Sequence, residues 1–307
     1  MLDRTSINWT GPMPAVVTPF AADLSIDEEA FAANIDRMLA HGATGIIAAG
    51  CTGEFWALSM AERARLCALT VGAVAGRGPA IIGAGAIRPE EAIEVSHAAK
   101  EAGADAVQVM PPYFVELTRR EMVSYFEQVD AGSALPVVLY NIHRRPGNAI
   151  TPEIASELAD LDKVVAIKES SSDWTNFHQT LLAVRDRIRV FCGPSSVYGV
   201  AATLSGADGL IDCFPNVWAP GCLDLWYATK AGRMDEAWAL QQVGHELTSL
   251  FTSGARTLYP ATKAAMETLG FSAGPPRPPL RPLDGAPLHE LTQEVRRLLG
   301  GRADAAA

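Results

Sequence analysis

The feature that most constrains the fold is a joint that recurs three times along the chain. A glycine, a short turn and an apolar run follow one another in 41–47, 102–107 and 205–211. Glycine is favoured just past a helix end because it adopts positive φ without a Cβ clash. Each stretch therefore predicts the end of a helix and the start of a strand, the pattern of a chain that alternates helices with parallel strands.

Other apolar runs complete a set of eight. The predicted strands begin at Ala15, Gly45, Ala80, Ala106, Val137, Val164, Val190 and Gly209. Helical patterns follow them at 28–40, 60–74, 89–102, 118–131, 152–159, 173–184, 197–204 and 221–230. This number of strand–helix units is typical of an α/β fold, the (β/α)8 TIM barrel. The alternative, an open doubly wound sheet, is disfavoured because no G-x-G-x-x-G motif follows the first strand.

The pattern changes after the eighth helix. Residues 1–230 are expected to form the catalytic barrel. Residues 231–300 are expected to form a C-terminal helical region, with helices at 233–251, 256–269 and 286–299. Residues 301–307 are expected to be a frayed, disordered tail.

Composition excludes several partners. The chain of 307 residues carries a formal net charge of -10 and has no basic cluster, so nucleic acid and anionic membranes are poor partners. No segment approaches the roughly 18 apolar residues of a membrane helix. The five cysteines are scattered without a C-x-x-C pair, which favours reduced thiols in a cytoplasmic protein over disulfides or a metal site.

A lysine ends one predicted strand. Lys168 follows the apolar run 164–167, which is typical of a strand buried on both faces. Burial lowers a lysine pKa and frees the amine to attack a carbonyl. From this motif alone, an amine that simply reaches water stays an equal alternative.

Two more polar features fall at the same edge of the predicted barrel, where active sites of such barrels lie. The G-C-T-G-E loop at 50–54 can converge backbone N–H groups on an anion, and Tyr140 ends the strand beside that of Lys168. Taken singly, the loop could be only a tight turn, and Tyr140 could simply cap the core with its hydroxyl in water. Together with Lys168 they indicate a 2-keto acid site, in which the loop binds the carboxylate, the amine forms an imine and the phenol moves protons.

These motifs resemble the dihydrodipicolinate synthase / N-acetylneuraminate lyase family of pyruvate-dependent class I aldolases, over almost the whole chain. The resemblance is carried by Pro19-Phe20, Gly50-Cys51-Thr52-Gly53-Glu54, Pro112-Tyr113, Tyr140-Asn141, Arg145-Pro146-Gly147, Ile167-Lys168-Glu169 and Pro279-Leu280. It implies a lyase that uses a covalent imine without metal or organic cofactor. It also implies a homodimer or homotetramer.

The resemblance assigns roles to single residues. Lys168 would form the Schiff base with pyruvate, and Tyr140 would relay protons. Thr52, with the N–H groups of the loop that includes Cys51 and Gly53, would hold the pyruvate carboxylate. Two more positions, Gly193 and Ile211, would line the pocket through their backbone.

Departures from the family pattern bear on the substrate. Cys51 stands where the synthase has a relay threonine, and a thiol is a weak donor. Phe114 aligns with the tyrosine that a neighbouring subunit contributes, while Tyr113 is one position away. Arg145 aligns with a substrate-binding arginine, although His143 and Pro146 on either side of it differ from the family pattern.

The resulting hypothesis is a lyase, an aldolase or dehydratase, acting on a 2-keto-3-deoxy sugar acid. One alternative is a 4-hydroxy-tetrahydrodipicolinate synthase that condenses pyruvate with aspartate semialdehyde. Another is a 2-keto-acid-binding sensor with little turnover. A metal- or phosphate-dependent barrel is a third, since Gly206-Ala207-Asp208-Gly209 resembles a phosphate loop.

Overall fold

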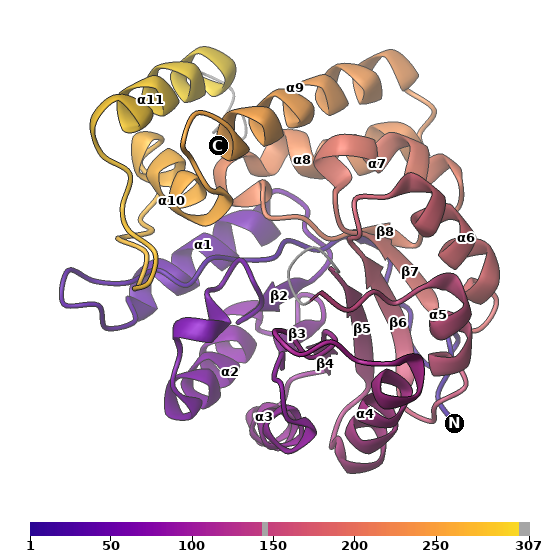
Figure 1. Ribbon diagram of the computed structural model, residues 1–307. Helices are drawn as coiled ribbons and strands as arrows, with labels where there is room; N and C mark the ends of the chain where they lie inside the picture. The colour runs from indigo at the N-terminus through magenta and orange to yellow at the C-terminus, as the bar shows by residue number, and fades with distance from the viewer. Residues whose placement is uncertain (143–146, 301–307) are drawn as a thin grey trace.

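The computed structural model describes residues 1–142 and 147–300. Its centre is an eight-stranded parallel sheet in the order β1-β8-β7-β6-β5-β4-β3-β2 (Figure 1). The strands are β1 (Gly11–Pro12), β2 (Ile46–Ala48), β3 (Ala80–Gly83), β4 (Ala106–Val109), β5 (Val137–Asn141), β6 (Val164–Glu169), β7 (Arg189–Cys192) and β8 (Gly209–Leu210). The expected tail at 301–307 lies outside the described residues.

The sheet closes on itself through the segment after β1. Ala15 forms a parallel bridge with Ile47, whose N–H donates to the Pro14 carbonyl at 2.9 Å. The Val16 N–H returns a 2.9 Å bond to the Ile47 carbonyl. The predicted (β/α)8 TIM barrel is therefore confirmed. Its first strand differs from expectation: regular pairing begins at Gly11 and is short, since Pro12 and Pro14 have no N–H to donate.

Helices surround the strands. They are α1 (Glu28–Ala40), α2 (Met60–Val74), α3 (Pro89–Ala102), α4 (Arg119–Gly132), α5 (Pro152–Leu158), α6 (Trp174–Val184), α7 (Ser195–Leu204) and α8 (Pro215–Lys230), with a 3-10 turn η1 (Phe55–Ala57) before α2. Local signals set several ends. Ser59 and Glu62 form a capping box at the start of α2, and Gly103 ends α3 at φ +89°.

Two helices begin earlier than the sequence predicted. The sequence favoured a start for α8 after Pro220, whereas the helix begins at Pro215 and kinks at Trp218, which has non-helical backbone angles. Pro220 thus lies inside the element, just past the kink that accommodates its ring. Likewise α7 begins at Ser195 and not at 197.

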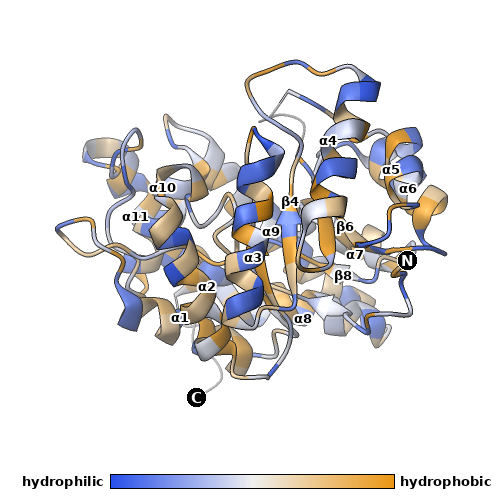
Figure 2. Ribbon diagram, turned by 90° about the horizontal axis from the view of Figure 1, so that it is seen from below, coloured by the Kyte–Doolittle hydropathy of each residue, from blue (hydrophilic) through white to orange (hydrophobic). Residues whose placement is uncertain are grey.

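The strands are apolar on both faces because they separate two packed layers. Ile47, Ile81, Val138 and Phe191 point into the barrel, whereas their neighbour Ile82 packs toward the helices. In Figure 2 the strands are largely hydrophobic and the outer faces of the helices are largely hydrophilic. None of the described helices combines the length and apolar character needed to cross a bilayer.

The C-terminal region covers one side of the barrel (Figure 1). It contains α9 (Met234–Thr252), α10 (Leu258–Thr268) and α11 (Gly285–Leu299). Leu247 of α9, Met266 of α10 and Leu291 of α11 form one buried cluster with Trp218 of α8. The helix α9 also packs against α7, which brings its side chains to the carboxyl ends of the last strands.

Candidate active site

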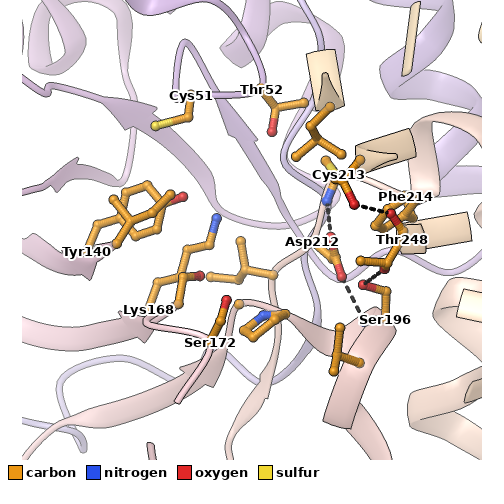
Figure 3. A pocket seen from close by; sticks show the side chains of 18 of the residues that line it. Cys51, Thr52, Tyr140, Lys168, Ser172, Ser196, Asp212, Cys213, Phe214 and Thr248 are labelled. Atoms are coloured by element: carbon orange, nitrogen blue, oxygen red, sulfur yellow. Dashed lines mark hydrogen bonds between the residues drawn. The ribbon is translucent and has the colours of Figure 1, made fainter. Parts of the chain in front are cut away.

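A cavity of about 540 Å³ lies at the carboxyl ends of the strands. Its walls come from the loop after β2, from the ends of β5 to β8, and from α9 and α10 (Figure 3). The residues that line it are Cys51, Thr52, Tyr140, Ile142, Lys168, Ser170, Ser172, Gly193, Pro194, Ser196, Val197, Ile211, Asp212, Cys213, Phe214, Thr248, Thr252, Leu258 and Tyr259.

Lys168 projects into this cavity from β6. Its side chain is only 5% exposed, and burial lowers the pKa of its amine, while Cys51 and Asp212 oppose that shift more weakly. Tyr140 of β5 is its register partner, and the Lys168 Nζ lies 4.3 Å from the centroid of the Tyr140 ring. The adjacency expected from the strand order is therefore present. A buried amine with a lowered pKa beside a phenol has the attributes of an imine-forming nucleophile.

The loop after β2 brings Cys51 and Thr52 to the cavity wall. It is fixed from behind, because the Thr18 hydroxyl donates to the Gly53 carbonyl at 2.8 Å. A Cβ on Gly53 would lie 3.1 Å from the Ala49 backbone, so the turn is too tight for most side chains. In the described part of the chain, the N–H groups of Thr52 and Gly53 donate to no protein acceptor, which leaves them available to an anion.

Glu54 ties this loop to the C-terminal region. Its side chain is 0% exposed, and Oε1 lies 2.7 Å from Nζ of Lys263 on α10, whose side chain is 2% exposed. Its Oε2 accepts the Arg277 N–H at 2.9 Å. Arg277 in turn forms an ion pair with Glu62 of α2, which lowers the pKa of that carboxyl to about 2. The loop after β2 is therefore held by residues far along the chain.

Gly193 and Ile211 both line the cavity, at the ends of β7 and β8. The Gly193 N–H donates to the Glu169 carbonyl at 2.8 Å, and a Cβ on Gly193 would fall 1.4 Å from Oγ of Ser170. Only a glycine fits there without displacing Ser170. Glu169 itself turns away from the reaction space, since its Oε1 accepts from Asn141 at 2.9 Å and from the Ser171 N–H at 2.8 Å.

Of the other residues expected at the site, Tyr113 packs against the cluster that contains Cys51 and Tyr140, but neither Tyr113 nor Phe114 is among the residues that line the cavity. Tyr113 packs edge-to-face on Phe55, 5.9 Å between ring centroids, and burial raises its pKa. Phe114 is 92% exposed and has φ +76°. Arg145 lies outside the described ranges.

The sequence did not predict one polar cluster that lines the cavity. Asp212 lies two residues past the end of β8, and Ser196 of α7 and Thr248 of α9 join it on the cavity wall (Figure 3). The available signal was a carboxylate directly after the eighth apolar run, just as Lys168 follows the apolar run 164–167 in the sequence. Within 1–142 and 147–300, no group of three or more His, Cys, Asp or Glu side chains is arranged to hold a metal ion.

Comparison with known proteins agrees with this arrangement. The family model described as the dihydrodipicolinate synthetase family matches residues 8–298. A 4-hydroxy-tetrahydrodipicolinate synthase of Methanoculleus marisnigri is 33% identical over 295 residues, 95% of this chain and 98% of the relative. An uncharacterized DapA-like lyase of Rhizobium meliloti is 31% identical over 291 residues, 95% of this chain and 96% of the relative.

Solved structures show the same likeness. YagE of E. coli K12, a prophage protein of the dihydrodipicolinic acid synthase family crystallised in complex with pyruvate, superposes with a TM-score of 0.90 at 28% identity. That match covers 95% of this chain and 99% of YagE.

Proposed function

The chain belongs to the dihydrodipicolinate synthetase family, and from this premise we propose that it cleaves or dehydrates a 2-keto-3-deoxy sugar acid through an imine on Lys168. As a member of this family it is a class I, pyruvate-dependent lyase. The observation that carries the residue assignment is the buried Lys168 amine, 4.3 Å from the ring centroid of Tyr140. Its lowered pKa supplies the neutral amine that imine formation requires.

The reaction begins at the substrate carbonyl. The Lys168 Nζ lone pair attacks C2 and forms a carbinolamine, and the Tyr140 hydroxyl gives its proton to the departing oxygen, which leaves as water. The protonated imine that remains on Nζ is an electron sink adjacent to C3. Thr52 and the N–H groups of its loop hold the substrate carboxylate throughout, which fixes C2 over the amine.

In the cleavage direction, the Tyr140 phenolate takes the proton of the C4 hydroxyl. The C3–C4 bond breaks, an aldehyde leaves, and the electron pair moves into the C2–C3 bond to give an enamine on Nζ. Tyr140 then returns its proton to C3. Water then adds to C2 and releases pyruvate. One proton of that water restores the Tyr140 hydroxyl, and the other restores the free amine of Lys168. Dehydration uses the same imine: the Tyr140 phenolate takes a C3 proton to give the enamine and passes it to the C4 hydroxyl, which leaves as water as a C3–C4 double bond forms.

A sugar acid is favoured over aspartate semialdehyde because two relay hydroxyls are missing. Cys51 offers a thiol, a weak donor, and Phe114 carries no hydroxyl. The synthase activity is the second candidate, favoured by the name of the Methanoculleus marisnigri relative. Parallel kcat/KM values for 2-keto-3-deoxy sugar acids and for condensation of pyruvate with aspartate semialdehyde separate the two. We expect the sugar acids to have the larger value, and a Cys51→Thr variant to gain synthase activity.

The assignment of Lys168 is tested by trapping. Incubation with pyruvate and borohydride should add a single adduct to the peptide that contains Lys168. Lys168→Ala should lose both adduct and turnover while remaining folded. Lys100→Ala, which changes an exposed lysine of α3, serves as the matched control and should keep both. An adduct on another lysine would overturn the mechanism, and adduct without turnover of any 2-keto acid would favour the binding sensor.

Self-association is part of the same proposal. Phe114 is a large apolar side chain that is 92% exposed, and Leu204 of α7 is also exposed. Such side chains are candidates for a buried position in a homodimer or homotetramer. Light scattering coupled to size-exclusion chromatography measures the state directly, and a monomer at all concentrations would refute it.

A further inference from the structure

Besides the Lys168 amine, the cavity contains a fixed negative charge to which the proposed mechanism assigns no step. Among the described residues that line it, Lys168 and Asp212 are the two charged side chains. Lys168 is committed to the imine, and the positive charge of that imine faces the reacting carbons. Asp212 comes from a different strand end, two residues past the last residue of β8. Among the described lining residues, it is therefore the charged side chain left to act on the rest of the substrate.

The Asp212 carboxylate is held in one orientation by three donors. Its Oδ1 accepts the Cys213 N–H at 2.6 Å, and its Oδ2 accepts the Ser195 hydroxyl at 2.9 Å and the Ser196 N–H at 2.8 Å. Ser195 and Ser196 open α7, whose N-cap residue Pro194 makes no side-chain cap bond. The turn that opens α7, up to the non-helical backbone of Tyr198, therefore fixes the carboxylate at the wall through these hydrogen bonds.

Accepting these hydrogen bonds does not by itself require an aspartate at position 212. An asparagine or a serine also accepts N–H bonds at a helix N-terminus. What the carboxylate adds is charge, and no described cation lines the cavity beside it to neutralise it, apart from Lys168. That charge acts on whatever part of the substrate extends past the imine.

The wall around Asp212 is lined by hydroxyl groups. The Thr248 Oγ1 donates to the Ser196 Oγ at 3.0 Å, and Thr252 lines the same side of the cavity. Figure 3 shows Asp212, Ser196 and Thr248 together, with Tyr140 on the other side of Lys168. A hydroxylated chain can donate to the carboxylate and exchange hydrogen bonds with these hydroxyls, whereas a second carboxylate meets a like charge in a site of reduced dielectric.

We infer that Asp212 is a specificity-determining residue that selects substrates with an uncharged, hydroxylated tail and rejects 2-keto acids with a second carboxylate. The inference rests on the proposed imine chemistry and adds to it the class of substrate tail. Discrimination arises because a fixed, partly buried carboxylate repels a like-charged ligand, whereas a hydroxylated tail can donate hydrogen bonds to it.

The test uses imine trapping, which does not depend on the chemistry after the imine. Half-saturating concentrations for borohydride-trapped adduct on Lys168 are measured for three probes: pyruvate, 2-keto-3-deoxygluconate and 2-oxoadipate. Pyruvate has no tail and serves as the reference. We expect the wild type to favour the hydroxylated probe over the dicarboxylate by about tenfold or more, and Asp212→Asn to reduce that ratio by about tenfold.

Two further variants support the interpretation. Asp212→Ser also removes the charge but leaves a shorter acceptor for the α7 cap, and it should shift the ratio in the same direction. Asp235→Asn makes the same chemical change at an exposed position on α9 and should leave all ratios unchanged. Circular dichroism confirms that each variant is folded.

The outcomes separate the two proposals. If pyruvate labels Lys168 but neither Asp212 variant changes the ratio, this inference fails and the imine mechanism stands. This inference also fails, and the imine mechanism stands, if the wild type binds 2-oxoadipate as tightly as it binds the hydroxylated probe. If pyruvate gives no adduct on Lys168 in the wild type, both proposals fail.

Discussion

Replacing Lys263 by methionine tests how the C-terminal region supports the active-site loop. The Lys263 Nζ lies 2.7 Å from Oε1 of Glu54, and the two side chains are 2% and 0% exposed. In the described part of the chain, Glu54 Oε1 accepts no well-aligned hydrogen bond, so the ammonium charge offsets its burial. Methionine keeps most of the apolar stem but removes that charge, which also lies 4.2 Å from the centroid of the Phe20 ring.

The expected cost follows from the buried charge that is left behind. Removing one partner of a buried ion pair typically costs about 3–5 kcal/mol, because the other charge stays buried without compensation. We expect a loss of this size in the free energy of unfolding. Because Glu54 ends the loop that carries Thr52, we also expect a weaker hold on the substrate carboxylate and a higher KM for the 2-keto acid.

A double-mutant cycle isolates the interaction. Denaturant unfolding and KM are measured for Lys263→Met, Glu54→Gln and the double variant, with Lys100→Met, at an exposed lysine, as the matched control. The double variant should recover part of the loss, with a coupling energy of about 0.5–3 kcal/mol. Strictly additive losses, or a Lys263→Met protein as stable as the control, would refute the reasoning.

Three further outcomes are expected. Tyr140→Phe should lower kcat by roughly 10²- to 10⁴-fold while adduct formation survives at a reduced rate, and a value within a few-fold of wild type would show that protons move by another route. Gly193→Ala should lower both stability and turnover, since the new Cβ would fall 1.4 Å from the Ser170 Oγ and 3.0 Å from the Glu169 carbonyl. The control is Gly72→Ala, where a new Cβ meets nothing within 4 Å, and this variant should have unchanged or increased stability. Burial holds the pKa of Lys168 below its usual value of 10.5, so the neutral fraction of the amine grows as pH rises through that lowered pKa. Trapping rates should therefore rise with pH and level off below pH 10.5. A rate that keeps rising up to pH 10.5 would contradict the shift.

Local sequence signals determined much of the barrel. The predicted bounds of α1, α2 and α3 agree with the structure because each end is set by neighbouring residues, such as Pro89 in the first turn of α3 and Gly103 after its last. The strands could be identified because burial on both faces requires continuous apolar runs. The adjacency of Tyr140 and Lys168 followed from the order of the strands, since consecutive parallel strands in a barrel are neighbours.

Tertiary structure alone decided which distant residues meet. Asp212, Ser196 and Thr248 come from three elements, and no periodicity in the chain signals that their side chains converge. The pairing of Glu54 with Lys263 likewise depends on how α10 packs against the barrel, which is set by the apolar cluster of the C-terminal helices. A sequence encodes the period and the ends of its elements within a few residues, whereas contacts between elements depend on the packing of the whole chain.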